Sequence, residues 1–198
     1  MTLTRAGASP AQVAAAHWLQ AAADVTSRVS GIAPTDIVRE ADEIEALPHE
    51  TPTTVLELMA DGLSPYEVVT HLLAEAMSVA KGRIYDVEEL RKRFEEAEEL
   101  AAQYIDHDPN LRDALLTEVR LTPLDPARPA QDLLEDLLYG IRGCRLIYQD
   151  YGTDETDMPD PETNDQAETH YDELDEKAVE TFLSALRAEA KATAERLN

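Results

Sequence analysis

Apolar residues recur every three or four positions along most of the chain, and no segment alternates in the manner of a β-strand. The first helix is expected to begin at Pro10, because Ser9 and Gln12 have the spacing of a capping box. Gly31 tolerates a left-handed conformation, so the helix should end there. Its core-facing stripe is predicted to contain Ala14, Trp18, Ala21, Val25 and Val29.

Proline marks the next two helices. The second is expected from Thr35 to Pro48, and a short third helix should start at Thr51, just before Pro52. The predicted core-facing positions of the second helix are Ile37, Ala41, Ile44 and Leu47.

The stretch LELMADGLSPYEVVTHLL at 56–73 predicts a helix, a tight turn and another helix. Gly62 provides the left-handed residue that ends the third helix. Ser64 and Glu67 form a second capping box, so a fourth helix follows and should end at Gly82.

Three more helices are predicted beyond this hairpin. The fifth carries a heptad seam, the sixth starts after Asp108, and the seventh runs from about Ala130 to Tyr151 with a wide apolar face. Gly140 and Gly143 each cost that helix about 1 kcal/mol relative to alanine, which indicates that another helix approaches closely. The seam of the fifth helix is Val87, Leu90, Phe94, Ala97, Ala101 and Tyr104, and the sixth helix carries Leu111, Leu115 and Val119.

The composition changes between Gly152 and Glu176, where 11 residues are acidic and none is Lys or Arg. A segment so poor in apolar residues cannot bury enough surface to offset its ordering entropy, so we predict a tether. The expected fold is an all-α bundle of about seven helices with a C-terminal amphipathic helix on this acidic tether. The corresponding segments are a helical body (1–151), an acidic linker (152–173) and the C-terminal helix (174–198).

The C-terminal helix is the predicted protein-contact site. Its apolar face would be costly to leave in water, so it is expected to dock on a partner. The competing possibility is that this helix completes the core of its own chain. The predicted contact residues are Val179, Phe182, Leu186 and Leu197.

Charge adds a constraint on the solvent. The 198-residue chain has 41 Asp and Glu against 17 Lys and Arg, a formal net charge of −24. Such a charge opposes compaction in dilute buffer and is screened at high salt. Scarce lysine beside abundant alanine, threonine and valine is typical of salt-in halophiles, and a high-GC mesophile is the alternative source.

No apolar leader and no window of 18 apolar residues occur, so we expect a cytoplasmic or virion protein without membrane contact.

The segment VLELMADGLSPYEV resembles the opening of LuxR-type and sigma-type helix-turn-helix domains over Val55 to about Leu72. The resemblance implies a DNA-binding regulator, which is the alternative function. The following THLLAEAMSVAK lacks the second turn that precedes a recognition helix in such domains. A chain of net charge −24 is also a poor partner for phosphate, so nucleic acid is not the expected partner. The residues that would contact DNA are Lys81, Arg83, Arg91, Lys92 and Arg93.

A second resemblance concerns Glu95, Glu96 and Glu99, which match the EExxE motif of all-α MazG-like nucleotide pyrophosphohydrolases. It implies magnesium binding beside a triphosphate. The ExxD partner motif of that family is absent, and Asp132 and Glu135 occur in reversed order. This enzyme is the lesser alternative.

Other chemistries lack the necessary residues. The five histidines do not have metal-ligand spacing, no GxSxG motif is present, and Cys144 lies on an apolar helical face that indicates a core position.

We therefore expect a non-enzymatic structural or interaction protein without cofactor or metal. It would be a homo-oligomer or a subunit of a multi-protein assembly in a halophilic archaeon or its virus. A virion head-tail connector is one example by architecture.

Overall fold

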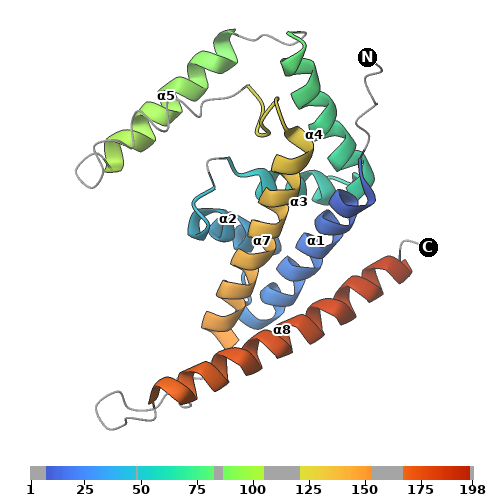
Figure 1. Ribbon diagram of the computed structural model, residues 1–198, viewed down its shortest axis with the longest axis vertical. Coiled ribbons are helices and arrows are strands. Elements are labelled where there is room, and N and C mark those ends of the chain that lie inside the picture. Colours follow the sequence, from blue (N-terminus) through green and yellow to red (C-terminus); the bar gives the residue numbers. More distant parts are fainter. Residues whose placement is uncertain (1–7, 48, 83–86, 105–120, 153–166, 197–198) are drawn as a thin grey trace.

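The computed structural model describes residues 8–47, 49–82, 87–104, 121–152 and 167–196 (Figure 1). Every regular element in these ranges is an α-helix, which confirms the predicted all-α fold. The predicted sixth helix lies outside the described residues. No helix in the described ranges is long and apolar enough to cross a bilayer. The helices are α1 (Pro10–Ser30), α2 (Pro34–Ile44), α3 (Thr51–Ala60), α4 (Pro65–Ala80), α5 (Val87–Tyr104), α7 (Pro129–Gly152) and α8 (Ala167–Arg196).

Both predicted capping boxes are present. The Ser9 hydroxyl accepts from the Gln12 backbone N–H at 3.3 Å, and the Gln12 amide oxygen accepts from the Ser9 N–H at 2.9 Å. Ser64 and Glu67 repeat this arrangement at the start of α4, with distances of 3.3 and 2.8 Å. Each box satisfies backbone N–H groups that a helix start otherwise leaves unpaired.

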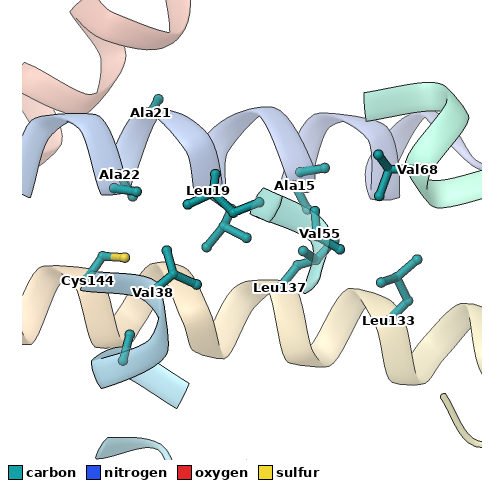
Figure 2. Packing of buried hydrophobic residues seen from close by; sticks show 14 of the residues in the cluster. Ala15, Leu19, Ala21, Ala22, Val38, Val55, Val68, Leu133, Leu137 and Cys144 are labelled. Carbon is teal, nitrogen blue, oxygen red and sulfur yellow. The ribbon is translucent and has the colours of Figure 1, made fainter. Parts of the chain in front are cut away.

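The core is built around α1 and α7, which run side by side in the same direction. Gln12 donates to the Ala130 carbonyl at 2.6 Å near the start of both helices, and Thr26 donates to the Cys144 carbonyl at 3.0 Å near their ends. Leu19 projects between the two helices toward Leu137 (Figure 2). The helices α2, α3 and α4 pack against this pair and close the core.

Two glycines let α7 approach its neighbours, as predicted. A Cβ atom at Gly143 would lie 2.5 Å from the Ala41 Cβ of α2. A Cβ atom at Gly140 would lie 2.8 Å from the Pro52 Cβ of α3 and 3.1 Å from a Leu19 methyl of α1. Since real Cβ atoms essentially never come so close, only glycine fits at Gly143 without displacing backbone.

The buried face of α1 differs from the predicted stripe. Leu19 and Ala22 face the core, while Trp18 is 36% exposed. Because α1 carries alanines on several of its sides, the hydrophobic pattern alone does not define which side faces the core. The side with small residues allows α7 to approach most closely. The prediction was right for Ala21 and Val25 and wrong for Ala14, Trp18 and Val29, which are exposed.

The inner face of α2 also differs in part. Ile37 and Ala41 are buried as predicted, but Ile44 is 46% exposed and Leu47 lies beyond the end of the helix. The helix instead turns Val38 and Asp42 inward. A buried carboxylate at such a position requires a hydrogen-bonding partner, which α3 supplies.

The C-terminal helix α8 is longer than predicted and packs on its own chain. It begins at Ala167 rather than near Leu174, and Gly152 is the last residue of α7, so the rest of the predicted linker, 153–166, lies outside the described residues. The helix lies across the C-terminal ends of α1 and α7 (Figure 1).

The helix α5 stands apart from the rest of the described structure. It contacts none of the other described helices, and its seam residue Phe94 is 40% exposed (Figure 1).

Candidate functional site

The predicted contact residues of α8 lie at an interface within the chain. Phe182 and Leu186 are 1% and 4% exposed and belong to the main core. The Phe182 ring lies 5.2 Å from that of Tyr148 on α7, with the two planes tilted by 57°. We call the surface of α1 and α7 that includes Arg28 and Tyr148 the α8 seat.

An ion pair adds to the contact between α8 and the α8 seat. The Arg28 guanidinium lies 2.6 Å from the Glu189 carboxylate, whose side chain is only 13% exposed. Such a pair orients the helix and contributes little to stability when one partner is exposed, as Arg28 is. The pair connects α8 to the last turn of α1.

In the described structure α8 therefore lies on its own chain, and its docking on a partner stays a prediction. Phe182 and Leu186 are covered by their own chain, because the body presents an apolar seat within reach of the helix. Val179 is half-buried, and Leu197 lies outside the described residues. The arrangement is the one expected if the helix completes the core of its own chain.

The exposed apolar surface lies on α7 instead. Leu134, Leu138 and Ile141 follow one another at steps of four and three, so they share one side of the helix. Leu138 is 55% exposed, and the other two are partly buried against the core. We call these three residues the α7 row. Tyr148 lies seven residues beyond Ile141 on the same side of α7, and Arg145 lies between them, so a charged residue separates the α7 row from the α8 seat.

A buried carboxylate joins α2 to α3. One oxygen of Asp42 accepts from the Thr53 backbone N–H at 3.1 Å and from its hydroxyl at 2.8 Å. Burial raises the pKa of Asp42 to about 6, the bonds from Thr53 lower it, and the negative charges of Glu50 and Asp136 raise it further. The other Asp42 oxygen is buried and has no protein hydrogen-bond partner.

Cys144 lies in the core near Asp42. Its side chain is fully buried, and burial together with the Asp42 charge raises the pKa of the thiol to about 12. A thiol that stays protonated and covered does not act as a nucleophile. This agrees with the predicted role as a small core residue.

The basic residues predicted for DNA contact do not form a free cluster. Arg91 pairs with Glu88, and Lys92 lies 3.4 Å from Glu96, all on α5. Lys81 is exposed at the end of α4, Arg93 is partly exposed, and Arg83 lies outside the described residues. The helix α4 continues from Pro65 to Ala80 without a second turn.

The predicted carboxylate motifs lie on separate helices that do not contact each other. Glu95, Glu96 and Glu99 are exposed on α5, whereas Asp132 and Glu135 are on α7. Asp132 accepts from the Asp125 backbone N–H at 2.7 Å, and Glu135 accepts from Gln131 at 2.7 Å. No group of three or more His, Cys, Asp or Glu side chains in the described ranges is arranged to hold a metal ion.

Comparison with known proteins gives no relative. No protein-family model matches the sequence, and neither a curated protein nor a solved structure is significantly similar to the chain.

Proposed function

We propose that this protein is a structural subunit of a larger protein assembly, without catalytic activity of its own. The observation that carries this proposal is the α7 row. Leu138 is 55% exposed, and its neighbour Tyr139 is 43% exposed, on the outer side of a central helix. Exposed apolar side chains that adjoin one another are typical of protein–protein contact surfaces.

The charge of the chain supports the same conclusion. The chain has 41 Asp and Glu among 198 residues, so the exposed leucine and tyrosine on α7 contrast with its acidic composition. Aromatic and aliphatic side chains at the centre of a polar rim are the usual composition of an interface core. Repulsion between chains of such charge is screened at high salt, so association is expected to be favoured there.

The proposed setting is the cytoplasm or virion of a salt-adapted archaeon or its virus, and a ring component such as a head-tail connector is one example. The setting rests on the scarcity of lysine and the excess of acidic residues. The connector example rests on architecture alone.

The test is the mass of the purified protein by sedimentation equilibrium at about 2 M KCl, where the Debye length is below about 3 Å. The expected result is a mass that is a multiple of 21.9 kDa. Leu138→Asp should shift the protein toward the single-chain mass. Ala130→Asp, which adds the same charge at another exposed position of α7, should leave the mass unchanged. A single-chain mass for the natural sequence at every concentration would contradict self-assembly.

A further inference from the structure

The helix α5 has an apolar side for which the other described helices provide no cover (Figure 1). On this side Phe94 is 40% exposed, and Ala97, one turn further along, is half-buried. The ion pair between Arg91 and Glu88 lies within the helix and, because both side chains are exposed, contributes little to its stability. Since helices in proteins are stabilised mostly by packing of an apolar side, we expect α5 to pack on a further surface.

We propose that α5 pairs in antiparallel orientation with α5 of a second copy of this chain. This inference rests on the proposed function, because it names a second copy as an assembly partner and adds α5 to the α7 row as a contact. The apolar residues of α5 repeat at alternating steps of three and four, which is the spacing of a two-stranded coiled coil. A two-fold axis would relate the two helices, so each contact would occur twice.

Charge complementarity favours a second α5 as the occupant. Three basic residues at 91–93 precede four acidic residues within 95–99, so one helix carries both signs beside the same apolar seam. Arg91 and Glu98 each follow a seam residue by one position, so both lie at one edge of the seam, and both are exposed. With Phe94 of one copy opposite Ala97 of the other, position 91 lies about 3 Å along the axis from position 98 of the second copy, at 1.5 Å per residue. A cation on each copy then faces a carboxylate on the other.

The sizes of the seam residues determine the direction. A parallel pair would also be complementary in charge, because Arg93 at the other edge would face Glu98. In parallel order, however, each seam residue meets its own copy, so a Phe–Phe layer is followed by two Ala–Ala layers. Antiparallel order instead places unlike residues opposite each other in every layer, which suits the uniform packing density of protein interiors. The layers are Phe94 opposite Ala97, Leu90 opposite Ala101, and Val87 opposite Tyr104.

The test uses two full-length variants, Arg91→Cys and Glu98→Cys, which carry tags of different size, are co-expressed and are studied at about 2 M KCl to screen repulsion. Circular dichroism first confirms that each retains its helix content. A short bis-maleimide crosslinker then joins the two chains where position 91 of one lies beside position 98 of the other. The natural chain controls for Cys144, whose thiol is buried.

Two matched pairs keep Glu98→Cys and move the other thiol. Lys92→Cys places it one residue further on, at an exposed position on the side of α5 away from the seam. Arg93→Cys places it at the other edge of the seam, where it would react in a parallel pair. The antiparallel arrangement predicts a mixed crosslinked dimer several-fold more abundant with Arg91→Cys than with either of the other two.

A second comparison tests the apolar seam. Phe94→Asp, introduced into both crosslinking chains, should reduce the yield of the mixed dimer several-fold. Ala102→Asp adds the same charge at an exposed position of α5 outside the seam and should leave the yield unchanged. Equal yields with these two changes would show that the seam is not the contact.

Equal crosslinking from all three thiol pairs, or none, would refute the pairing. Absence of crosslinks is also the result expected if α5 packs on another segment of its own chain, such as the predicted sixth helix. A larger yield with Arg93→Cys would overturn the antiparallel direction. If the pairing fails, a multimeric mass of the natural chain by sedimentation would leave the assembly proposal standing with another interface, whereas a single-chain mass would refute self-assembly as well.

Discussion

Asp42 on α2 caps the helix α3 through Thr53, eleven residues further along the chain. The Thr53 N–H is one of the three backbone donors at the start of α3 that have no partner within the helix's own regular hydrogen-bond pattern. Glu50, which precedes the helix, provides no side-chain cap. The Asp42 carboxylate takes that place from the neighbouring helix. A buried acid of this kind links the packing of α2 and α3 to its own protonation.

Asp42→Asn is expected to change how stability depends on pH. Because folding raises the pKa of Asp42 from 3.8 to about 6, the folded state binds the proton more tightly than the unfolded state. The contribution of Asp42 to the free energy of unfolding therefore falls as pH rises from about 4 to 6. The total loss is about 3 kcal/mol, at 1.36 kcal/mol per pKa unit. Asparagine keeps an acceptor for Thr53 and does not ionise, so the variant should be more stable than the natural chain at pH 7.

The measurement is the free energy of unfolding by denaturant at pH 4.5 and 7, at constant salt. Many other carboxylates titrate in this range, so the informative quantity is the difference between the variant and the natural chain. Asp61→Asn, at an exposed position, is the control and should leave that difference near zero. Equal pH dependence in Asp42→Asn and the natural chain would show that Asp42 does not carry the effect.

Phe182→Ala is expected to destabilise the fold. The Phe182 ring is 1% exposed and packs on Tyr148, so its removal loses apolar burial and leaves a cavity. Losses of about 3 to 5 kcal/mol are usual for such a change. Leu183→Ala, one position away and 38% exposed, should change the unfolding free energy by less than about 0.5 kcal/mol. If Phe182→Ala left the thermal melt unchanged, α8 would not be part of the core.

Local signals in the sequence are sufficient for the starts of α1 and α4. Ser9 with Gln12 and Ser64 with Glu67 act within one turn, so their spacing predicts the cap without knowledge of the rest of the fold. The close approach at Gly143 was also predictable, because glycine inside a helix is unfavourable unless space requires it.

Tertiary relationships were the part that the sequence did not determine. The alanine-rich α1 has more than one apolar side. Which side, and hence whether Leu19, faces the core depends on where α7 lies. The burial of Asp42 depends on its partner Thr53, which belongs to another helix. The docking of Phe182 likewise depends on a seat formed by residues distant in sequence.

Ser64→Ala separates a scaffold role of the α3–α4 hairpin from a DNA-binding role. The serine hydroxyl accepts from the Glu67 N–H, so its loss should lower stability by about 0.5 to 2 kcal/mol. Because α4 has no second turn and Arg91 and Lys92 are paired with carboxylates, we expect no salt-dependent affinity of the natural chain for random duplex DNA. Fluorescence anisotropy across KCl concentrations measures this affinity. Unchanged stability in Ser64→Ala together with lost DNA binding would instead support the regulator.

Salt dependence of folding is the most direct consequence of the composition. At about 0.01 M salt the Debye length is about 30 Å, so carboxylates repel one another across much of the molecule. The helix α5 shows the local effect, since Glu95, Glu96, Glu98 and Glu99 are all exposed within five residues. Folding places such charges closer together than the unfolded chain does, which makes the folded state the more strongly penalised one.

Dialysis from about 2 M KCl to low ionic strength should therefore reduce the helical circular dichroism and the melting temperature. Adding KCl back should restore both, whereas sucrose at equal osmolality should restore them only in part, because it strengthens apolar burial without screening charge. This comparison separates screening from a general effect of cosolutes on compaction. Full helix content and an unchanged melting temperature without salt would show that the core around α1 and α7 outweighs the repulsion, and would remove the main reason for assigning the chain to a halophile.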